Sequence, residues 1–125
     1  MDNKSNALNW FEIPVSDMSR AKKFYETIFN VEMFSMEMGG NPMAFFPCEQ
    51  GKVGGALLLE KGVNPSKDGC LVYLNANPSI QTVIDKIEAA GGKLLVPKAQ
   101  VTPEIGFVAY FTDSEGNKVG LHANQ

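Results

Sequence analysis

Cysteine, histidine and tryptophan are scarce in this sequence, whose 125 residues include two cysteines, one histidine and one tryptophan. Two cysteines are too few for a disulfide scaffold, and Cys48 and Cys70 do not have CxxC spacing. We therefore expect both thiols to pack in the core of a cytoplasmic protein. The polar segment Met1–Asn6 lacks the apolar stretch of a signal peptide, and no run of about 20 apolar residues follows, so we expect no membrane partner.

Strong charge of either sign is also missing. The 14 acidic and 11 basic residues give a net charge of -3, and no run of Lys and Arg occurs. This distribution predicts that nucleic acid is not a partner. The content of 44% hydrophobic and 20% charged residues is that of an ordinary globular protein. We expect residues 1–125 to form one domain that folds without disulfides or a structural metal.

The first half of the chain has the pattern of one helix and four strands. Residues 9–15 alternate between the two faces of a strand. The apolar face carries Phe11, Ile13 and Val15, and the mixed face carries Trp10, Glu12 and Pro14. Ser16 and Asp17 then offer a helix cap, and apolar residues recur at helical spacing from Ala21 to Phe29. Extended stretches at 31–38, 43–47 and 53–60 complete a βαβββ module over residues 8–60.

The second half, residues 69–122, repeats this order. Alternation over 70–75 predicts a strand, Asn77 followed by Pro78 predicts the cap and first position of a helix, and Gly91 ends that helix.

Three further strands are expected at 93–96, 106–112 and 118–122, and the ends of the halves match in sequence, 51–55 with 117–121 and 43–46 with 108–111. The predicted fold class is α+β: two tandem βαβββ modules that form a cupped eight-stranded sheet around a common hollow.

Several segments resemble a known family. They are Phe11-Glu-Ile-Pro-Val-Ser-Asp17 with Ala21 and Phe24-Tyr25, then Ala89-Ala-Gly-Gly-Lys93, and last Phe111-Thr-Asp-Ser-Glu-Gly-Asn-Lys-Val-Gly120. In these segments the sequence resembles the vicinal oxygen chelate superfamily, which includes glyoxalase I, extradiol dioxygenases, fosfomycin-resistance enzymes and bleomycin-resistance proteins. The resemblance implies the glyoxalase/bleomycin-resistance fold, a small-molecule ligand and a homodimer.

The resemblance also predicts where a metal ion would be held. Metal-dependent members use His, Gln or Glu side chains, and the corresponding positions here are Trp10, Gly54, Gly120 and either Gly69 or Leu71. None of these side chains is a ligand for a divalent cation of this class. We therefore expect no metal cofactor.

Two polar residues on the mixed faces are candidate catalytic groups. Glu12 places a carboxylate in the middle of a strand, where an acid needs a partner or a ligand. His122 is the only histidine, and an imidazole can serve as a general acid or base. The alternatives are that Glu12 pairs with Lys or Arg or reaches solvent, and that His122 is solvated near the C-terminus. Glu60 has the same strand parity as Gly54, but we expect it to be a solvated strand end.

Aromatic residues on the same faces are candidate ligand contacts. Trp10, Tyr73, Tyr110 and Phe45 offer flat walls for a planar or hydrophobic molecule, and packing is the alternative for each. The methionines between residues 33 and 43 offer an adaptable apolar surface, or else core or a dimer contact.

Three functions are compatible with this pattern. The first is a small-molecule-binding protein of the glyoxalase/bleomycin-resistance type without the usual metal site. The second is an enzyme, a lyase, isomerase or dioxygenase resembling glyoxalase I, with a divalent metal held by Glu12, His122 and a third group. The third is a non-catalytic interaction subunit whose cup is filled by its own side chains.

Overall fold

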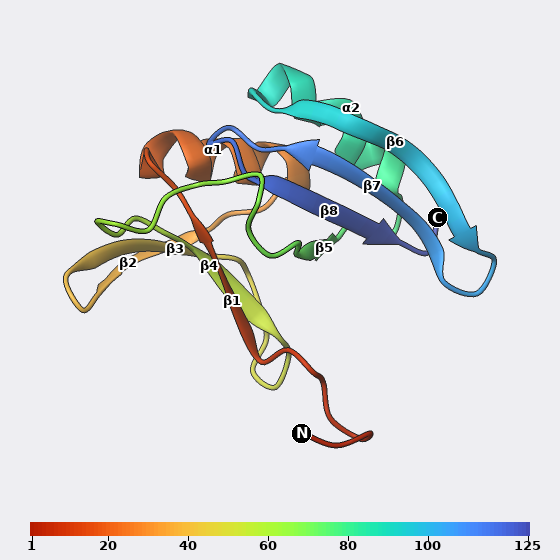
Figure 1. The fold of residues 1–125 in the computed structure, drawn as a ribbon, viewed down its shortest axis with the longest axis horizontal. Coiled ribbons are helices and arrows are strands. Elements are labelled where there is room, and N and C mark those ends of the chain that lie inside the picture. The colour runs from red at the N-terminus through yellow and green to blue at the C-terminus, as the bar shows by residue number, and fades with distance from the viewer.

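The chain runs twice through the same order of strands and helices (Figure 1). The computed structural model describes all 125 residues. The first module contains β1 (Trp10–Pro14), α1 (Met18–Phe29), β2 (Phe34–Met38), β3 (Asn41–Phe45) and β4 (Gly54–Leu58). The second contains β5 (Tyr73–Asn75), α2 (Ile80–Ala90), β6 (Lys93–Thr102), β7 (Gly106–Thr112) and β8 (Lys118–Ala123). The predicted α+β fold with two βαβββ modules is confirmed.

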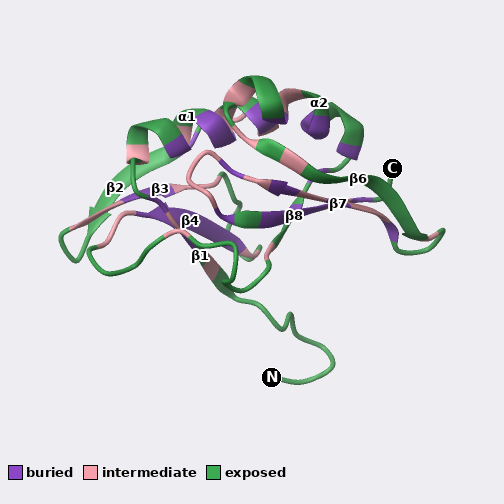
Figure 2. Ribbon diagram, turned by 45° about the horizontal axis from the view of Figure 1, so that its top comes forward, coloured by how far each residue is buried: buried purple, intermediate pink, exposed green.

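The eight strands form two four-stranded sheets, in the orders β1-β4-β3-β2 and β5-β8-β7-β6. In each sheet the first strand is parallel to the last, and the other pairs are antiparallel. Helices α1 and α2 pack against each other and lie together on one side of the sheets (Figure 2). No strand of one sheet lies beside a strand of the other. The sheet faces turned away from the helices therefore remain open, as the 43% exposure of Trp10 and 46% exposure of Tyr73 show.

One hydrophobic core joins the modules. Its 20 buried residues come from both halves of the chain. Helix α1 buries Phe24 and Tyr25, and the ring of Phe24 lies 6.0 Å from that of Phe111 on β7. Because this contact crosses between modules, the two halves share one hydrophobic core. Neither helix is long and apolar enough to span a bilayer.

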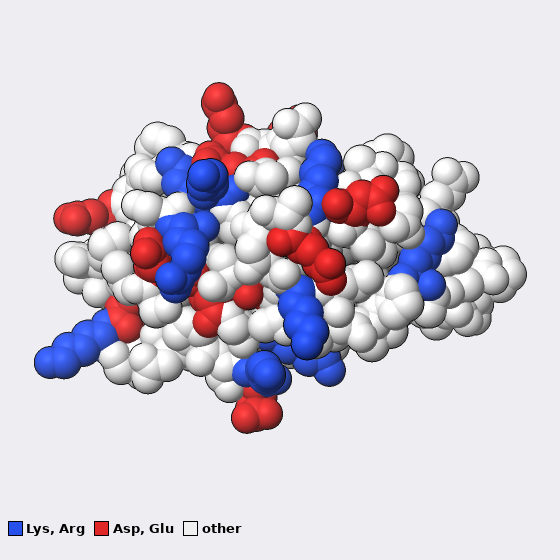
Figure 3. Space-filling view, turned by 90° about the horizontal axis from the view of Figure 1, so that it is seen from above, with Lys and Arg blue, Asp and Glu red and all other residues white.

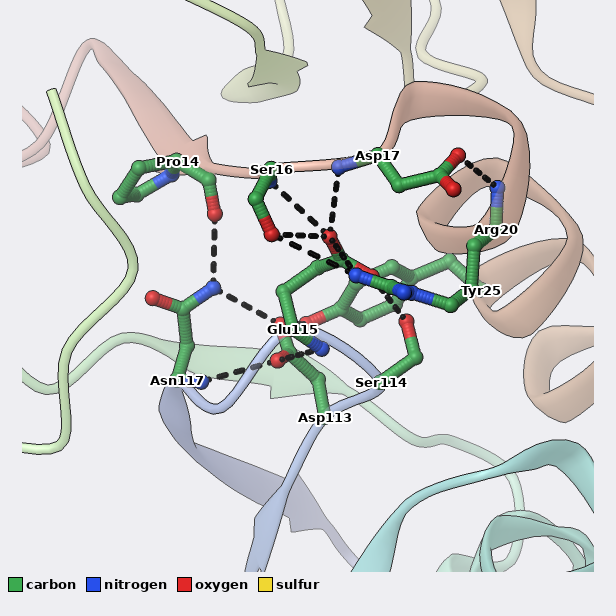
Figure 4. A network of polar contacts seen from close by, with 9 residues as sticks. All are labelled: Pro14, Ser16, Asp17, Arg20, Tyr25, Asp113, Ser114, Glu115 and Asn117. Atoms are coloured by element: carbon green, nitrogen blue, oxygen red, sulfur yellow. Dashed lines mark hydrogen bonds and ion pairs between the residues drawn. The ribbon is translucent and has the colours of Figure 1, made fainter.

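A buried turn between β7 and β8 connects the second module to the first (Figure 4). Tyr25 donates a hydrogen bond to Asp113 Oδ2 at 2.7 Å, and Asn117 Nδ2 donates to the carbonyl of Pro14 at 2.8 Å. Burial and the negative charge of Asp113 raise the pKa of Tyr25 well above its ordinary value. The buried polar groups are thus satisfied across the module boundary.

Glu115 extends this connection to the start of helix α1. Its Oε1 accepts hydrogen bonds from the backbone N–H groups of Ser16 at 2.9 Å and Asp17 at 2.8 Å, and its Oε2 lies 2.7 Å from Arg20 Nε. The turn that the sequence predicts between β7 and β8 therefore binds the other module, a role that turn chemistry alone does not indicate.

Helix α2 begins later than expected. Ser79 is its N-cap, so the prediction that Asn77 caps it and Pro78 opens it is wrong. The side chain of Asn77 has other partners: its Oδ1 accepts from the backbone N–H of Asn124, and its Nδ2 donates to Asn75 Oδ1, both at 2.8 Å. Asn77 thus connects the loop to the C-terminus instead of capping the helix.

The predicted burial of the two cysteines is also wrong, because both are exposed. Cys48 lies in the connection between β3 and β4, and Cys70 precedes β5, which comprises only three residues instead of the predicted 70–75. Strand β6, by contrast, continues to Thr102 instead of ending at Val96. It is an edge strand, where Pro97 interrupts no pairing on its outer side.

Candidate functional site

Each module places an aromatic ring over a glycine of the neighbouring strand. Trp10 pairs with Gly54, and Tyr73 pairs with Gly120. A Cβ atom added at Gly54 would lie 3.3 Å from the indole, and one added at Gly120 would lie 2.7 Å from the phenol ring. The phenol ring therefore occupies the space of a side chain at Gly120, whereas at Gly54 the indole and Cys48, 3.2 Å from the added atom, together leave a side chain little room.

These pairs establish which residues of the two modules are equivalent. Tyr73 occupies in the second module the position that Trp10 occupies in the first. The prediction that this position is Gly69 or Leu71 is wrong, because both residues precede the short strand β5. The predicted strand parity is correct, and only the distance along the chain differs.

The open face of the first sheet contains a hollow of about 390 Å³. It is lined by Trp10, Glu12, Met38, Asn41, Met43, Phe45, Leu58 and Glu60. The rings of Trp10 and Phe45 lie 5.7 Å apart, tilted by 49°, while Met43 and Leu58 are buried side chains of the lining. This arrangement combines apolar surface with two carboxylates.

Neither carboxylate in this hollow has a basic partner. Glu12 Oε2 accepts a hydrogen bond from Trp10 Nε1 at 3.2 Å, and Glu60 Oε1 accepts one from Asn41 Nδ2 at 3.3 Å. The single ion pair of the chain lies elsewhere, between Arg20 and Glu115. Glu60 is half-buried and lines the same hollow as Glu12. Its strand parity with Gly54 indicated this position, but its place beside a turn favoured a solvated strand end.

A second hollow, of about 460 Å³, lies on the open face of the second sheet. Its lining includes Tyr73, Asn75 and His122. His122 Nε2 is 2.6 Å from the carbonyl oxygen of Ile105. Because a carbonyl only accepts, Nε2 is the donor in this contact, and in a neutral imidazole Nδ1 is then the acceptor. The hydroxyl groups of Tyr73 and Tyr110 lie 2.7 Å apart, and this hydrogen bond, with some burial, raises the pKa of Tyr73.

A third hollow, of about 680 Å³, lies between the modules. Most of its 17 lining residues come from two segments, 46–55 and 72–77. Its lining includes Phe11 and Phe46, which belong to the apolar side of the first sheet, and it contains neither Glu12 nor His122. The hollow between the halves is therefore not a hollow to which either predicted polar group contributes.

The predicted site residues thus fall into two groups. Trp10, Glu12 and Phe45 line the first hollow. Tyr73 and His122 line the second, and Tyr110 joins them through its hydrogen bond to Tyr73. None of the three hollows contains residues of both groups, although Tyr73 also lines the third hollow.

The residues at the expected metal positions do not fit a metal ion. Trp10, Gly54 and Gly120 offer no donor atom, and the raised pKa of Tyr73 disfavours the phenolate that would ligate. No three His, Cys, Asp or Glu side chains are grouped closely enough to hold a metal ion.

Comparisons with known proteins agree with this architecture. The family model of the Glyoxalase/Bleomycin resistance protein/Dioxygenase superfamily matches residues 7–121. A glyoxylase-like domain-containing protein of Didymella fabae is 26% identical over 115 residues, covering 88% of this chain and 88% of its own. CFP32 of Mycobacterium tuberculosis, provisionally assigned as a glyoxylase, is 24% identical over 90% of this chain, which spans only 44% of that relative's length.

Solved structures show the same fold. The crystal structure of TnmS3, an antibiotic binding protein from Streptomyces sp. CB03234, superposes with a TM-score of 0.65 at 20% identity, covering 97% of this chain and 98% of its own. At this identity the likeness concerns the fold.

Proposed function

Because this chain belongs to the glyoxalase/bleomycin resistance protein/dioxygenase superfamily, we propose that it binds a small, partly apolar molecule without the metal centre of the metal-dependent members. The observation that carries the proposal is the pair of aromatic rings, Trp10 over Gly54 and Tyr73 over Gly120. In both modules a flat apolar surface takes the place of a metal ligand. Such surfaces, with a few polar groups beside them, are typical of small-molecule sites.

Glu12 and His122 supply the polar contacts in this proposal, and any acid–base chemistry would use them. Glu12 Oε1 has no hydrogen-bond partner, so it is free to accept from a ligand. His122 presents Nδ1 as an acceptor while Nε2 is held by Ile105. Phe45 and the phenol groups of Tyr73 and Tyr110 complete the proposed contacts.

We further propose that the protein is a homodimer in which the first sheet of one copy faces the second sheet of the other. Exposed apolar side chains support this, since Phe34 is 64% exposed and Met38 51% exposed on the open face. The open face of the first sheet carries the carboxylate of Glu12, whereas that of the second carries Lys118, whose ammonium group lies over the ring of Tyr110. Opposite charges favour this pairing over two like sheets. It brings Glu12 of one copy to the same cup as His122 of the other.

The exposed free thiols fit a reducing compartment, and we therefore propose a cytoplasmic protein.

Metal analysis and a ligand panel test the binding proposal. Protein purified without chelators is expected to contain far less than one Zn, Ni, Mn or Fe ion per chain, and a metabolite panel is expected to contain a compound that raises Tm. Stoichiometric metal that is lost in Glu12→Ala and His122→Ala but kept in Glu37→Ala would overturn the metal-free assignment. A panel without any shift in Tm would instead favour the interaction subunit.

A further inference from the structure

The hollow on the first sheet is rich in negative potential and has no basic residue. Its lining includes two carboxylates and two aromatic rings. None of the strands that build it contains Lys or Arg. Glu12 is exposed and Glu60 is half-buried, and each accepts one hydrogen bond from a neutral group and has no basic partner. No residue that lines the hollow therefore neutralises either carboxylate.

Trp10, Phe45 and Glu12 meet at one end of this hollow. Glu12 and Phe45 both pair with Ala56, from opposite sides, so they lie in one row across the sheet. The indole N–H of Trp10 holds Oε2 of Glu12 at 3.2 Å and leaves Oε1 free. The faces of aromatic rings carry negative potential and attract cations, most strongly for tryptophan. Two rings and a free carboxylate oxygen therefore border the same space.

The middle of the lining is apolar, while Asn41 and Glu60 are the polar residues of its remainder. Met43 and Leu58 pair with each other next to this end and are almost fully buried. Glu60 lies four residues beyond Ala56 on the strand direction of β4, roughly 13 Å away along the backbone, so the two carboxylates mark opposite ends. A ligand that fills the hollow thus contacts charge at its head and apolar side chains along its body.

We propose that this hollow binds an organic cation, a substituted ammonium whose head lies between Trp10, Phe45 and Glu12 and whose body lies over Met43 and Leu58. The inference rests on the proposed binding function and names its ligand class. A neutral ligand of this shape would desolvate Glu12 without compensation, and an anion would be repelled by both carboxylates. The cation satisfies the free oxygen of Glu12 and the ring faces together.

The single tryptophan of the chain reports directly on this site. Titration of the wild-type protein with choline and with 3,3-dimethylbutan-1-ol, which has the same shape without the charge, separates charge from size. We expect choline to change Trp10 fluorescence saturably and to bind about tenfold more tightly than the alcohol.

Two matched variants locate the charge. Glu12→Gln is expected to weaken choline binding by about tenfold, as measured by calorimetry. The control is Glu37→Gln, which removes the same charge from strand β2. Glu37 pairs with Pro42 and lies on the opposite face from Met38, outside the hollow, so choline binding should not change. Glu12 is exposed, so its variant is expected to fold.

The outcomes distinguish this inference from the function on which it rests. Equal affinity for choline and the alcohol, or an unchanged affinity in Glu12→Gln, would overturn the cation assignment and leave small-molecule binding intact. The same holds if choline fails to bind while a neutral or anionic compound of the metabolite panel does. If no compound of any charge binds, both the inference and the proposed function fail.

Discussion

The side chain of Glu115 is fully shielded from solvent although it is ionised, because the other module surrounds it with donors. Desolvation by burial opposes its ionisation, but hydrogen bonds from Arg20, from the backbone of Asp17 and Ser16 and from Ser114 lower its pKa from 4.5 to about 2. A carboxyl group whose pKa is lower in the folded than in the unfolded state stabilises the fold above its unfolded pKa. That contribution is lost as the pH falls toward the folded value.

Replacing Glu115 therefore has a pH-dependent cost. Glu115→Gln is expected to lower the free energy of unfolding by about 2 kcal/mol at pH 7, because the charge-assisted hydrogen bonds are lost. The difference from wild type should shrink as the pH falls from 4.5 toward 2, the interval between the two pKa values. Urea denaturation at pH 7, 4 and 3 measures it.

The control for this experiment is Glu88→Gln on the exposed side of α2, which should change stability by less than about 0.5 kcal/mol. A cost for Glu115→Gln that is the same at every pH would show that the charge of Glu115 does not contribute.

At the scale of elements, the two helices begin in different ways. Asp17, the N-cap of α1, accepts a hydrogen bond on its side chain from the backbone N–H of Arg20 at 3.0 Å. Ser79, the N-cap of α2, makes no such bond. A side-chain cap satisfies one of the unpaired N–H groups of the first turn, so only the first helix gains from its cap.

The matched substitutions follow from this difference. Asp17→Ala is expected to lower the free energy of unfolding by about 1 kcal/mol, and Ser79→Ala by less than half of that. The backbone N–H of Asp17 keeps its bond to Glu115 in the variant, so the measurement isolates the cap. Urea denaturation at neutral pH compares the two variants, and equal losses would contradict the assignment.

Element order was predictable from the sequence, whereas element ends were not. The pattern predicts β7 at 106–112, as found. This strand lies between β8 and β6, so it is paired on both sides along its length. The predicted strand at 70–75 is only Tyr73–Asn75, and the one at 93–96 continues to Thr102. Periodicity identifies a face, but strand length depends on the partner strand, which periodicity does not reveal.

Register between the modules shows the same limit. The sequence repeat matches Met43 with Val108, whereas strand pairing matches Phe45 with Val108. Phe45 pairs with Ala56, and Val108 pairs with His122, which is the residue of the second module equivalent to Ala56. The shift of two residues keeps every side chain on its predicted face. It arises because the connections that follow β3 and β7 differ in length.

The first hollow was predictable in part. Strand parity places Trp10 and Glu12 on one open face, and in the structure Phe45, also a predicted ligand contact, lines the same hollow. The separation of Glu12 from His122 was not predictable, because it depends on how α1 packs against α2 and so orients the two sheets. Local patterns contain no information about that angle.

At the scale of the whole molecule, charge is distributed by face. On the side that carries the helices, basic and acidic side chains are interspersed (Figure 3). The strands of the two sheets, in contrast, are segregated, with acids in the first and lysines in the second. Of these charged groups, Glu12 and Lys118 lie on the open faces, where Lys118 covers the ring of Tyr110, and their opposite charges favour association through the sheets.

The proposed homodimer is tested by mass. We expect light scattering to give twice the 13.6 kDa of one chain, with weaker association at high salt because the attraction is electrostatic. Phe34→Asp introduces a charge on the open face and should weaken the dimer by at least about tenfold. The control is Ser35→Asp on the same strand. Ser35 pairs with the buried Ala44 and lies on the opposite face from Phe34, so this variant should leave the mass unchanged.

A wild-type mass of one chain at high protein concentration would contradict the dimer. The two open faces would then act as separate hollows, and Glu12 and His122 would contact different ligands. The choline titration distinguishes a monomer that binds its ligand from a protein that binds none, because the proposed cation site between Trp10, Phe45 and Glu12 lies within a single chain. Binding without dimerisation would therefore leave the cation site in place and restrict the role of His122 to the second hollow.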